Sequence, residues 1–239
     1  MRVSAGMRDL RSFYVRANTC VACHQNIDSD ILKAGHPELT FELDGQSTAE
    51  PAHWRDEDPA SGLRGWLVGQ AVALREVSWT LSKSETPDRE LIAKWSGLVW
   101  LLTKATTNQT RLPAISLTGK TDHAAFDLMK DQADLLARRA AECSWSTDSA
   151  RKLLLEFAAA DSEFGASQQT SSEVLFRRAE RLVPALERLS AAVNRNTSPI
   201  AKNQDLASLL EDVRAIPFQP AKFAADLAIF RTTIERVPY

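Results

Sequence analysis

The chain has 239 residues, of which 44% are hydrophobic and 25% charged, as in an ordinary globular protein with a sizeable core. A formal net charge of −2 excludes a nucleic-acid-binding protein held by bulk positive charge. Three cysteines are too few for a disulfide scaffold, and no apolar run reaches the roughly 18 residues of a membrane span. Nine glycines and two tyrosines argue against a turn-rich β protein, so we expect an all-α fold.

The first predicted element is a short helix over residues 7–18, which leads into the string Cys20-Val21-Ala22-Cys23-His24. This string is a C-x-x-C-H motif, the attachment sequence of c-type haem. Two thiols three positions apart lie on one side of a helical turn, where both can add to the vinyl groups of one haem. The motif therefore predicts one covalently attached haem c, with Cys20 and Cys23 as thioethers and His24 as the proximal ligand of the iron.

Two other interpretations of this cysteine pair are weaker. A redox dithiol usually opens a helix in a βαβ unit, and the sequence shows no such pattern. A zinc finger would use Cys20, Cys23 and then His36, after twelve intervening residues. Its second histidine should fall at positions 40–42, which hold Thr, Phe and Glu, so the finger is incomplete.

The sixth position of the iron has several candidate ligands. Residues 30–33 predict one or two helical turns, which Gly35 ends and Pro37 keeps from resuming. His36 directly follows the glycine that ends this helix. We therefore expect its backbone to be held firmly and its side chain to serve as the distal ligand of the iron.

The alternatives are His53, in a loop beside Trp54, a methionine such as Met7 or Met129, and an open site. The fourth histidine, His123, is expected to be a solvated or capping residue in the first turn of a later helix.

The charge is unevenly distributed along the chain. Residues 19–60 carry nine acidic side chains against two basic ones. The net charge of this segment is therefore about −7, and that of the remainder is about +5. Acidic groups around the haem are expected to lower its reduction potential and to steer a basic partner at low salt.

From residue 62 onward, apolar residues recur at helical spacing. We expect short loops and an antiparallel bundle, with Cys143 as a buried helix thiol. The expected helices are 62–82, one capped by Thr86 and running to 106, one opened by Thr121-Asp122 and running to 143, one capped by Ser146 over 148–163, one over 172–194 with a kink at Pro184, and two over 203–214 and 220–235.

The expected architecture is thus all-α, with short helices and loops around one haem c followed by an antiparallel helical bundle. The expected domains are a haem c-binding segment over residues 1–61 and the bundle over 62–239, which can also pack as one continuous domain.

About a third of the chain, residues 10–85, resembles secreted multihaem cytochromes of the cytochrome c554-like family. The similarity lies in the C-x-x-C-H motif and three later strings: Gly35-His36-Pro37-Glu38-Leu39-Thr40-Phe41-Glu42, His53-Trp54-Arg55 and Trp66-Leu67-Val68-Gly69-Gln70. The resemblance implies that His36 is a distal haem ligand. This chain departs from the family in lacking a second C-x-x-C-H motif, so we expect a single haem.

These observations predict a single-haem c-type cytochrome that transfers electrons, with two histidine ligands, a low-spin iron and no catalytic activity. A first alternative is a cytochrome subunit of a larger redox complex or extracellular filament, with the helical bundle as assembly module. A second is a haem enzyme with an open distal site. The expected partners are redox proteins, including other cytochrome subunits, with no nucleic acid and no membrane span.

Haem c is attached outside the bacterial cytoplasm, which predicts a periplasmic or extracellular protein. The first twenty residues lack the apolar region of an export signal, so we expect the signal to be missing from this chain.

Overall fold

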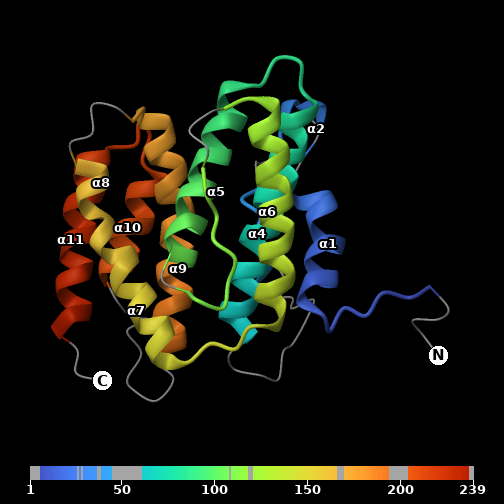
Figure 1. The fold of residues 1–239 in the computed structure, drawn as a ribbon. Helices are drawn as coiled ribbons and strands as arrows, with labels where there is room; N and C mark the ends of the chain where they lie inside the picture. Colours follow the sequence, from blue (N-terminus) through green and yellow to red (C-terminus); the bar gives the residue numbers. More distant parts are fainter. Residues whose placement is uncertain are drawn as a thin grey trace. The chain divides into compact units, whose positions relative to one another are not determined.

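The computed structural model describes residues 6–25, 27, 29–36, 39–44, 61–107, 109–117, 121–165, 170–193 and 204–236. Every regular element in these ranges is a helix, which confirms the all-α fold (Figure 1). Within the same ranges, no helix is both long and apolar enough to cross a membrane.

The chain forms two compact units. The first comprises Met1–Leu91 and Thr106–Ser144, and the second comprises Ile92–Ala105 and Trp145–Tyr239. This division differs from the expected boundary at residue 61. The helix that carries the C-x-x-C-H motif packs on later helices, and so it shares a core with them.

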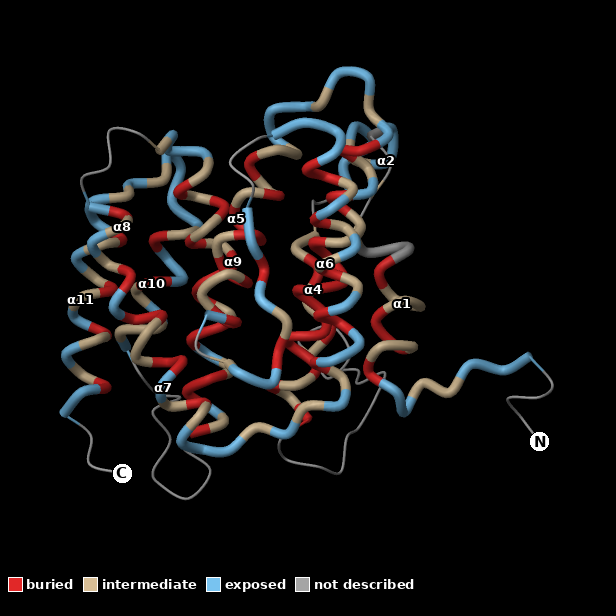
Figure 2. Tube along the Cα trace, in the orientation of Figure 1, coloured by how far each residue is buried: buried red, intermediate tan, exposed pale blue. Residues whose placement is uncertain are grey.

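The first unit is built around two long helices, α4 (Ser61–Lys83) and α6 (His123–Glu142), which pack along each other. A shorter helix, α1 (Phe13–His24), lies against both, and α2 (Ser29–Lys33) follows it (Figure 1). Most of α4 is buried, as the red stretches of Figure 2 show. The apolar residues of α1 recur at helical spacing on its buried face: Phe13, Ala17 and Val21.

Helix α1 begins six residues later than expected and runs through the haem motif. Ser12 is its N-cap, and its hydroxyl accepts a hydrogen bond from the backbone N–H of Val15. At the other end, the N–H of Gln25 donates to the carbonyl of Val21. The prediction of a helix over residues 7–18 was therefore wrong at both ends, because Ser12 starts the helix and the motif continues it.

A close backbone contact joins the segment after α2 to α4. Phe41 and Leu43 are buried in the core of the first unit. A Cβ built at Gly69 would lie 2.8 Å from the backbone N of Leu43 and 2.9 Å from its Cβ. Gly69 thus lets the two backbones approach, which gives a structural reason for the glycine in the Trp66–Gln70 string.

Replacing Gly69 by alanine is expected to destabilise the protein by about 1–2 kcal/mol. Overpacking against the Leu43 backbone outweighs the roughly 1 kcal/mol that alanine gains over glycine in a helix. Thermal or urea unfolding measures the change. Gly165→Ala is the control, since its Cβ would meet Ala224 at an ordinary 3.9 Å. Equal stabilities of the two variants would contradict the predicted clash.

The second unit contains the middle of α5 and the chain from Trp145 to Tyr239. Helix α7 packs on α9, and α11 packs on α8 and α10. Gly97 of α5 allows a similar close approach, because its Cβ would lie 2.8 Å from the carbonyl oxygen of Arg177 in α9. The helices of this unit are α5 (Arg89–Thr107), α7 (Thr147–Ala158), the 3-10 turn η2 (Ala159–Asp161), α8 (Ser162–Gly165), α9 (Ser172–Val193), α10 (Gln204–Arg214) and α11 (Pro220–Arg236).

Side-chain caps account for two of the helix starts that the sequence predicted. Asp122 and Ser146 cap α6 and α7 as expected, each accepting a backbone N–H in the first turn. The expected cap at Thr86 was wrong. Helix α5 starts at Arg89, and the carboxylate of Asp88 accepts the N–H of Leu91 at 3.2 Å.

The helix expected over 148–163 is interrupted after Ala158 by the η2 turn, and α8 follows as a separate short helix. Pro184 lies inside α9, as the sequence predicted.

Candidate functional site

The C-x-x-C-H motif occupies the last turns of α1, so that Cys20, Cys23 and His24 belong to one helix. Cys20 lies three positions after Ala17 and seven after Phe13, on the side of α1 that packs on the unit. It is half-buried and forms no disulfide. The side chains of Cys23 and His24 lie outside the described part of the structure.

The backbone at His36 is fixed by a Schellman motif at the end of α2. The N–H of His36 donates to the carbonyl of Ile31 at 3.2 Å, and that of Gly35 donates to Leu32 at 3.0 Å. Gly35 has a φ of +98°, the left-handed conformation that this motif requires. The sequence prediction of a helix stop at Gly35 is confirmed, and the His36 side chain is exposed.

The other candidate ligands occupy very different places. Met129 is buried in α6, whereas Met7 is exposed. His123 is exposed at the start of α6, as expected, and its Nδ1 donates to the carbonyl of Ser82 at 3.1 Å. His53 lies outside the described residues.

Cys143 is not the buried helix thiol that the sequence predicted. It is the C-cap of α6, with extended backbone, because the helix ends one residue earlier at Glu142. Its side chain is half-buried, and its Sγ lies 3.7 Å from the carbonyl oxygen of Ser144.

Across the ranges that the structure describes, no three His, Cys, Asp or Glu residues form a group that could hold a metal ion. Of the acidic residues expected around the haem, Asp30 is exposed and pairs with Lys33 at 2.9 Å. Six others lie outside the described residues: Asp28, Glu38, Glu50, Asp56, Glu57 and Asp58.

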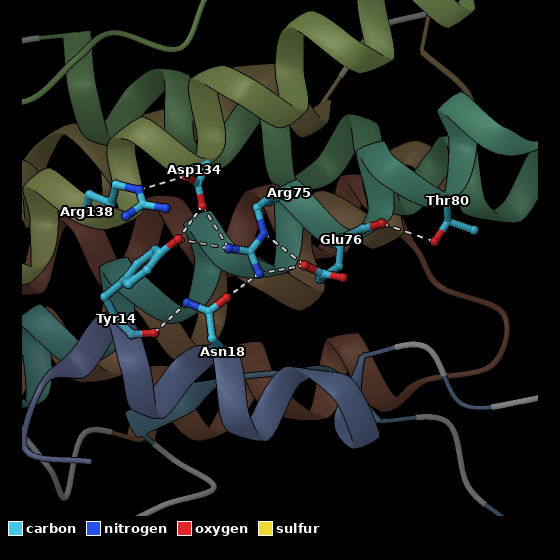
Figure 3. A network of polar contacts seen from close by, with 7 residues as sticks. All are labelled: Tyr14, Asn18, Arg75, Glu76, Thr80, Asp134 and Arg138. Carbon is cyan, nitrogen blue, oxygen red and sulfur yellow. Dashed lines mark hydrogen bonds and ion pairs between the residues drawn. The ribbon is translucent and has the colours of Figure 1, made fainter. Parts of the chain in front are cut away.

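A polar network joins α1 to both long helices of the first unit (Figure 3). The Oη of Tyr14 donates to Oδ1 of Asp134 at 2.7 Å, and Nη1 of Arg75 donates to the same oxygen at 2.8 Å. Nη2 of Arg75 also donates to Oδ1 of Asn18 at 2.5 Å. Tyr14 and Asn18 are one helical turn apart on α1, so that two residues of this helix bind partners on α4 and α6.

Two further residues complete the network. Glu76 accepts hydrogen bonds from Nε and Nη2 of Arg75, at 2.8 and 2.6 Å. Arg138 donates from Nε to Asp134 at 2.8 Å, and its guanidinium lies 4.4 Å from the centre of the Tyr14 ring. Asp134 is therefore bonded by two guanidinium groups and one phenol.

The network shifts the pKa values of its members. Burial alone would raise the pKa of Asp134, but the hydrogen bonds from Tyr14, Arg138 and Arg75 outweigh it, and the pKa of this carboxyl is lowered. Burial raises the pKa of Tyr14, and the bond to Asp134 raises it further. At neutral pH, Asp134 is thus an ionised acceptor and Tyr14 a neutral donor.

Sequence reasoning missed this network. The sequence feature that points to the network is the adjacent pair Arg75-Glu76, which interrupts an otherwise apolar stretch of α4 between Leu74 and Val77. A charged pair within a buried helix needs partners from other elements. The network fixes α1, and with it the backbone of the motif, to α4 and α6.

The donor set of the motif fits a covalently attached haem. Two thiols three positions apart in one helix suit the two thioether bonds, and the imidazole of the next residue suits the iron. Comparison of the chain with protein-family models, with curated proteins and with solved structures finds no match in any of them.

Proposed function

We propose that this protein is a single-haem c-type cytochrome that transfers electrons. The observation that carries the proposal is the position of the motif. The whole C-x-x-C-H string lies at the end of α1, and α1 is fixed to α4 and α6 by buried apolar residues and by the Arg75–Asp134 network. A helix held in this way keeps the attachment residues in place while an electron enters and leaves.

Each residue has a distinct role in this proposal. The thiols of Cys20 and Cys23 hold the haem covalently, and His24 binds its iron from one side. His36 is the proposed second axial ligand, because the Schellman motif fixes its backbone and its imidazole is exposed in the chain. The bound haem supplies an iron that alternates between the ferric and ferrous states. With two histidine ligands, its potential lies below that of His/Met cytochromes.

Mass spectrometry of the chain, produced in a host that exports it and attaches haem c, tests the proposal. We expect the polypeptide mass plus the mass of one haem, and a pyridine haemochrome spectrum typical of haem c. A chain that carries no haem under these conditions, or that carries zinc, would contradict it.

Replacing His36 by alanine is expected to convert a low-spin iron to a high-spin form that binds imidazole or azide. Removal of an axial ligand leaves the sixth position open, and visible spectroscopy of both oxidation states detects the change. His123→Ala is the matched control and should leave the spectrum unchanged, because His123 bonds to Ser82.

His53→Ala tests the competing ligand. An unchanged low-spin spectrum in His36→Ala, together with a high-spin spectrum in His53→Ala, would assign the iron to His53 instead.

A further inference from the structure

A cavity of about 340 Å³ opens in the first unit at the N-terminal end of α1, the end opposite to the haem motif. Its walls come from three parts of the unit: the start of α1, the first turns of α4 and the last turns of α6. The lining residues that matter here are Arg11, Phe13, Tyr14, Arg64, Arg138 and Glu142. Its size is near the lower end of the range for small-molecule sites, which is about 300–1,000 Å³.

The lining of the cavity carries more positive than negative groups. Arg11, Arg64 and Arg138 line it, against the single carboxylate of Glu142. The side chains of Glu142 and Arg11 are 76% and 82% exposed, so solvent screens both of these charges. The positive end of the α1 helix dipole adds to this potential, since the first turn of α1 contains no acidic residue.

Two of the three guanidinium groups lie over aromatic rings of α1. The guanidinium carbon of Arg138 lies 4.4 Å from the centre of the Tyr14 ring, and that of Arg64 lies 5.5 Å from the centre of the Phe13 ring. A guanidinium group over an aromatic ring is attracted by the ring's negative face, which helps to hold the arginine side chain in place.

Two of the arginines are also held by carboxylates. Arg11 bonds Asp9 through Nε and Nη2, at 2.9 and 2.8 Å, and lowers the pKa of Asp9 to about 2. The hydrogen bond from Arg138 to Asp134 uses Nε. An arginine has five N–H donors, so these bonds orient the side chains and leave donors for a ligand.

We propose that this cavity binds a small organic anion through a carboxylate or phosphate group. Guanidinium groups bind carboxylates and phosphates in a planar, often bidentate manner. The half-buried ring of Tyr14 also lines the cavity and adds apolar surface for an organic body. This proposal does not rest on the haem, because the cavity is formed by residues outside the motif.

Isothermal titration calorimetry of the full-length protein at low ionic strength tests the site, with phthalate and inorganic phosphate as probes. We expect saturable 1:1 binding of phthalate, weakened by salt, and weaker binding of phosphate, which lacks the flat body. Arg64→Gln should weaken phthalate binding about tenfold. Arg11→Gln should weaken it several-fold without affecting folding, because the Arg11 side chain is 82% exposed.

Arg214→Gln is the matched control, since it makes the same charge change on α10, in the second unit. An equal loss of phthalate affinity in Arg214→Gln and Arg64→Gln would show that binding depends on the net charge of the protein and not on the cavity. That result would overturn the proposal. No saturable binding of either probe would also overturn it.

Titration of the haem-loaded protein and of the Cys20→Ser/Cys23→Ser variant separates this site from the proposed function. Equal phthalate binding by both forms supports an independent anion site. Binding by the haem-free form alone would assign the cavity to the haem itself and overturn the proposal.

Discussion

Replacing both Cys20 and Cys23 by serine is expected to abolish covalent haem attachment completely and to leave the helical fold intact. Serine hydroxyls do not form the thioether bonds that hold haem c, and the buried face of α1 depends on Phe13, Ala17 and Val21 instead. Haem staining after denaturing electrophoresis measures attachment, and far-ultraviolet circular dichroism measures the fold.

Cys143→Ser is the control for this prediction. It removes the third thiol, which caps α6 outside the motif, and it should keep a full complement of haem. Covalent haem in the double variant, or its loss in Cys143→Ser, would show that the attachment residues are assigned wrongly.

Replacing Asp134 by alanine is expected to cost about 2–4 kcal/mol of folding free energy. The variant loses hydrogen bonds to Tyr14, Arg75 and Arg138, and it leaves the Arg75 side chain, which is 15% exposed, without its partner on α6. Urea unfolding at neutral pH measures the loss.

Asp131→Ala is the matched control on the same helix. The Asp131 side chain is 75% exposed and pairs only loosely with Lys130, at 3.4 Å, so its removal should change stability by less than about 0.5 kcal/mol. Similar losses in the two variants would argue against a structural role for the network.

The contribution of Asp134 also depends on pH, with a sign fixed by its lowered pKa. A carboxyl with a lower pKa in the folded state than in the unfolded state stabilises the fold fully above the ordinary aspartate pKa of about 3.9. This stabilisation is lost as the pH falls below that value. The stability difference between wild type and Asp134→Ala should therefore shrink in acid, and a difference that stays constant down to pH 2 would contradict the assignment.

Hydrophobic periodicity and capping residues predicted most of the helices. The long apolar repeats of α4 and α6 and the caps Asp122 and Ser146 are local signals, which the structure confirms. The start of α1 was missed because Ser12 lies inside a stretch that also has helical spacing. The break after Ala158 was missed because no glycine or proline marks it.

Only those features of the candidate site that residues close together in the sequence form could be predicted. The motif and the helix stop at Gly35 depend on neighbouring residues, so the sequence shows both. The contact between Gly69 and Leu43 and the bond between Tyr14 and Asp134 join residues that are 26 and 120 positions apart. Such pairs follow from tertiary packing, which no spacing rule for a single helix reveals.

The end of α1 at which the motif lies has an electrostatic consequence for the proposed cytochrome. The last backbone carbonyls of a helix carry a partial negative charge, equivalent to about half an elementary charge. In the proposed cytochrome, a positive centre held beside this end of α1 would be stabilised by about 0.3–1 kcal/mol for each unit of charge. The same helix would thus favour the oxidised form of the proposed haem.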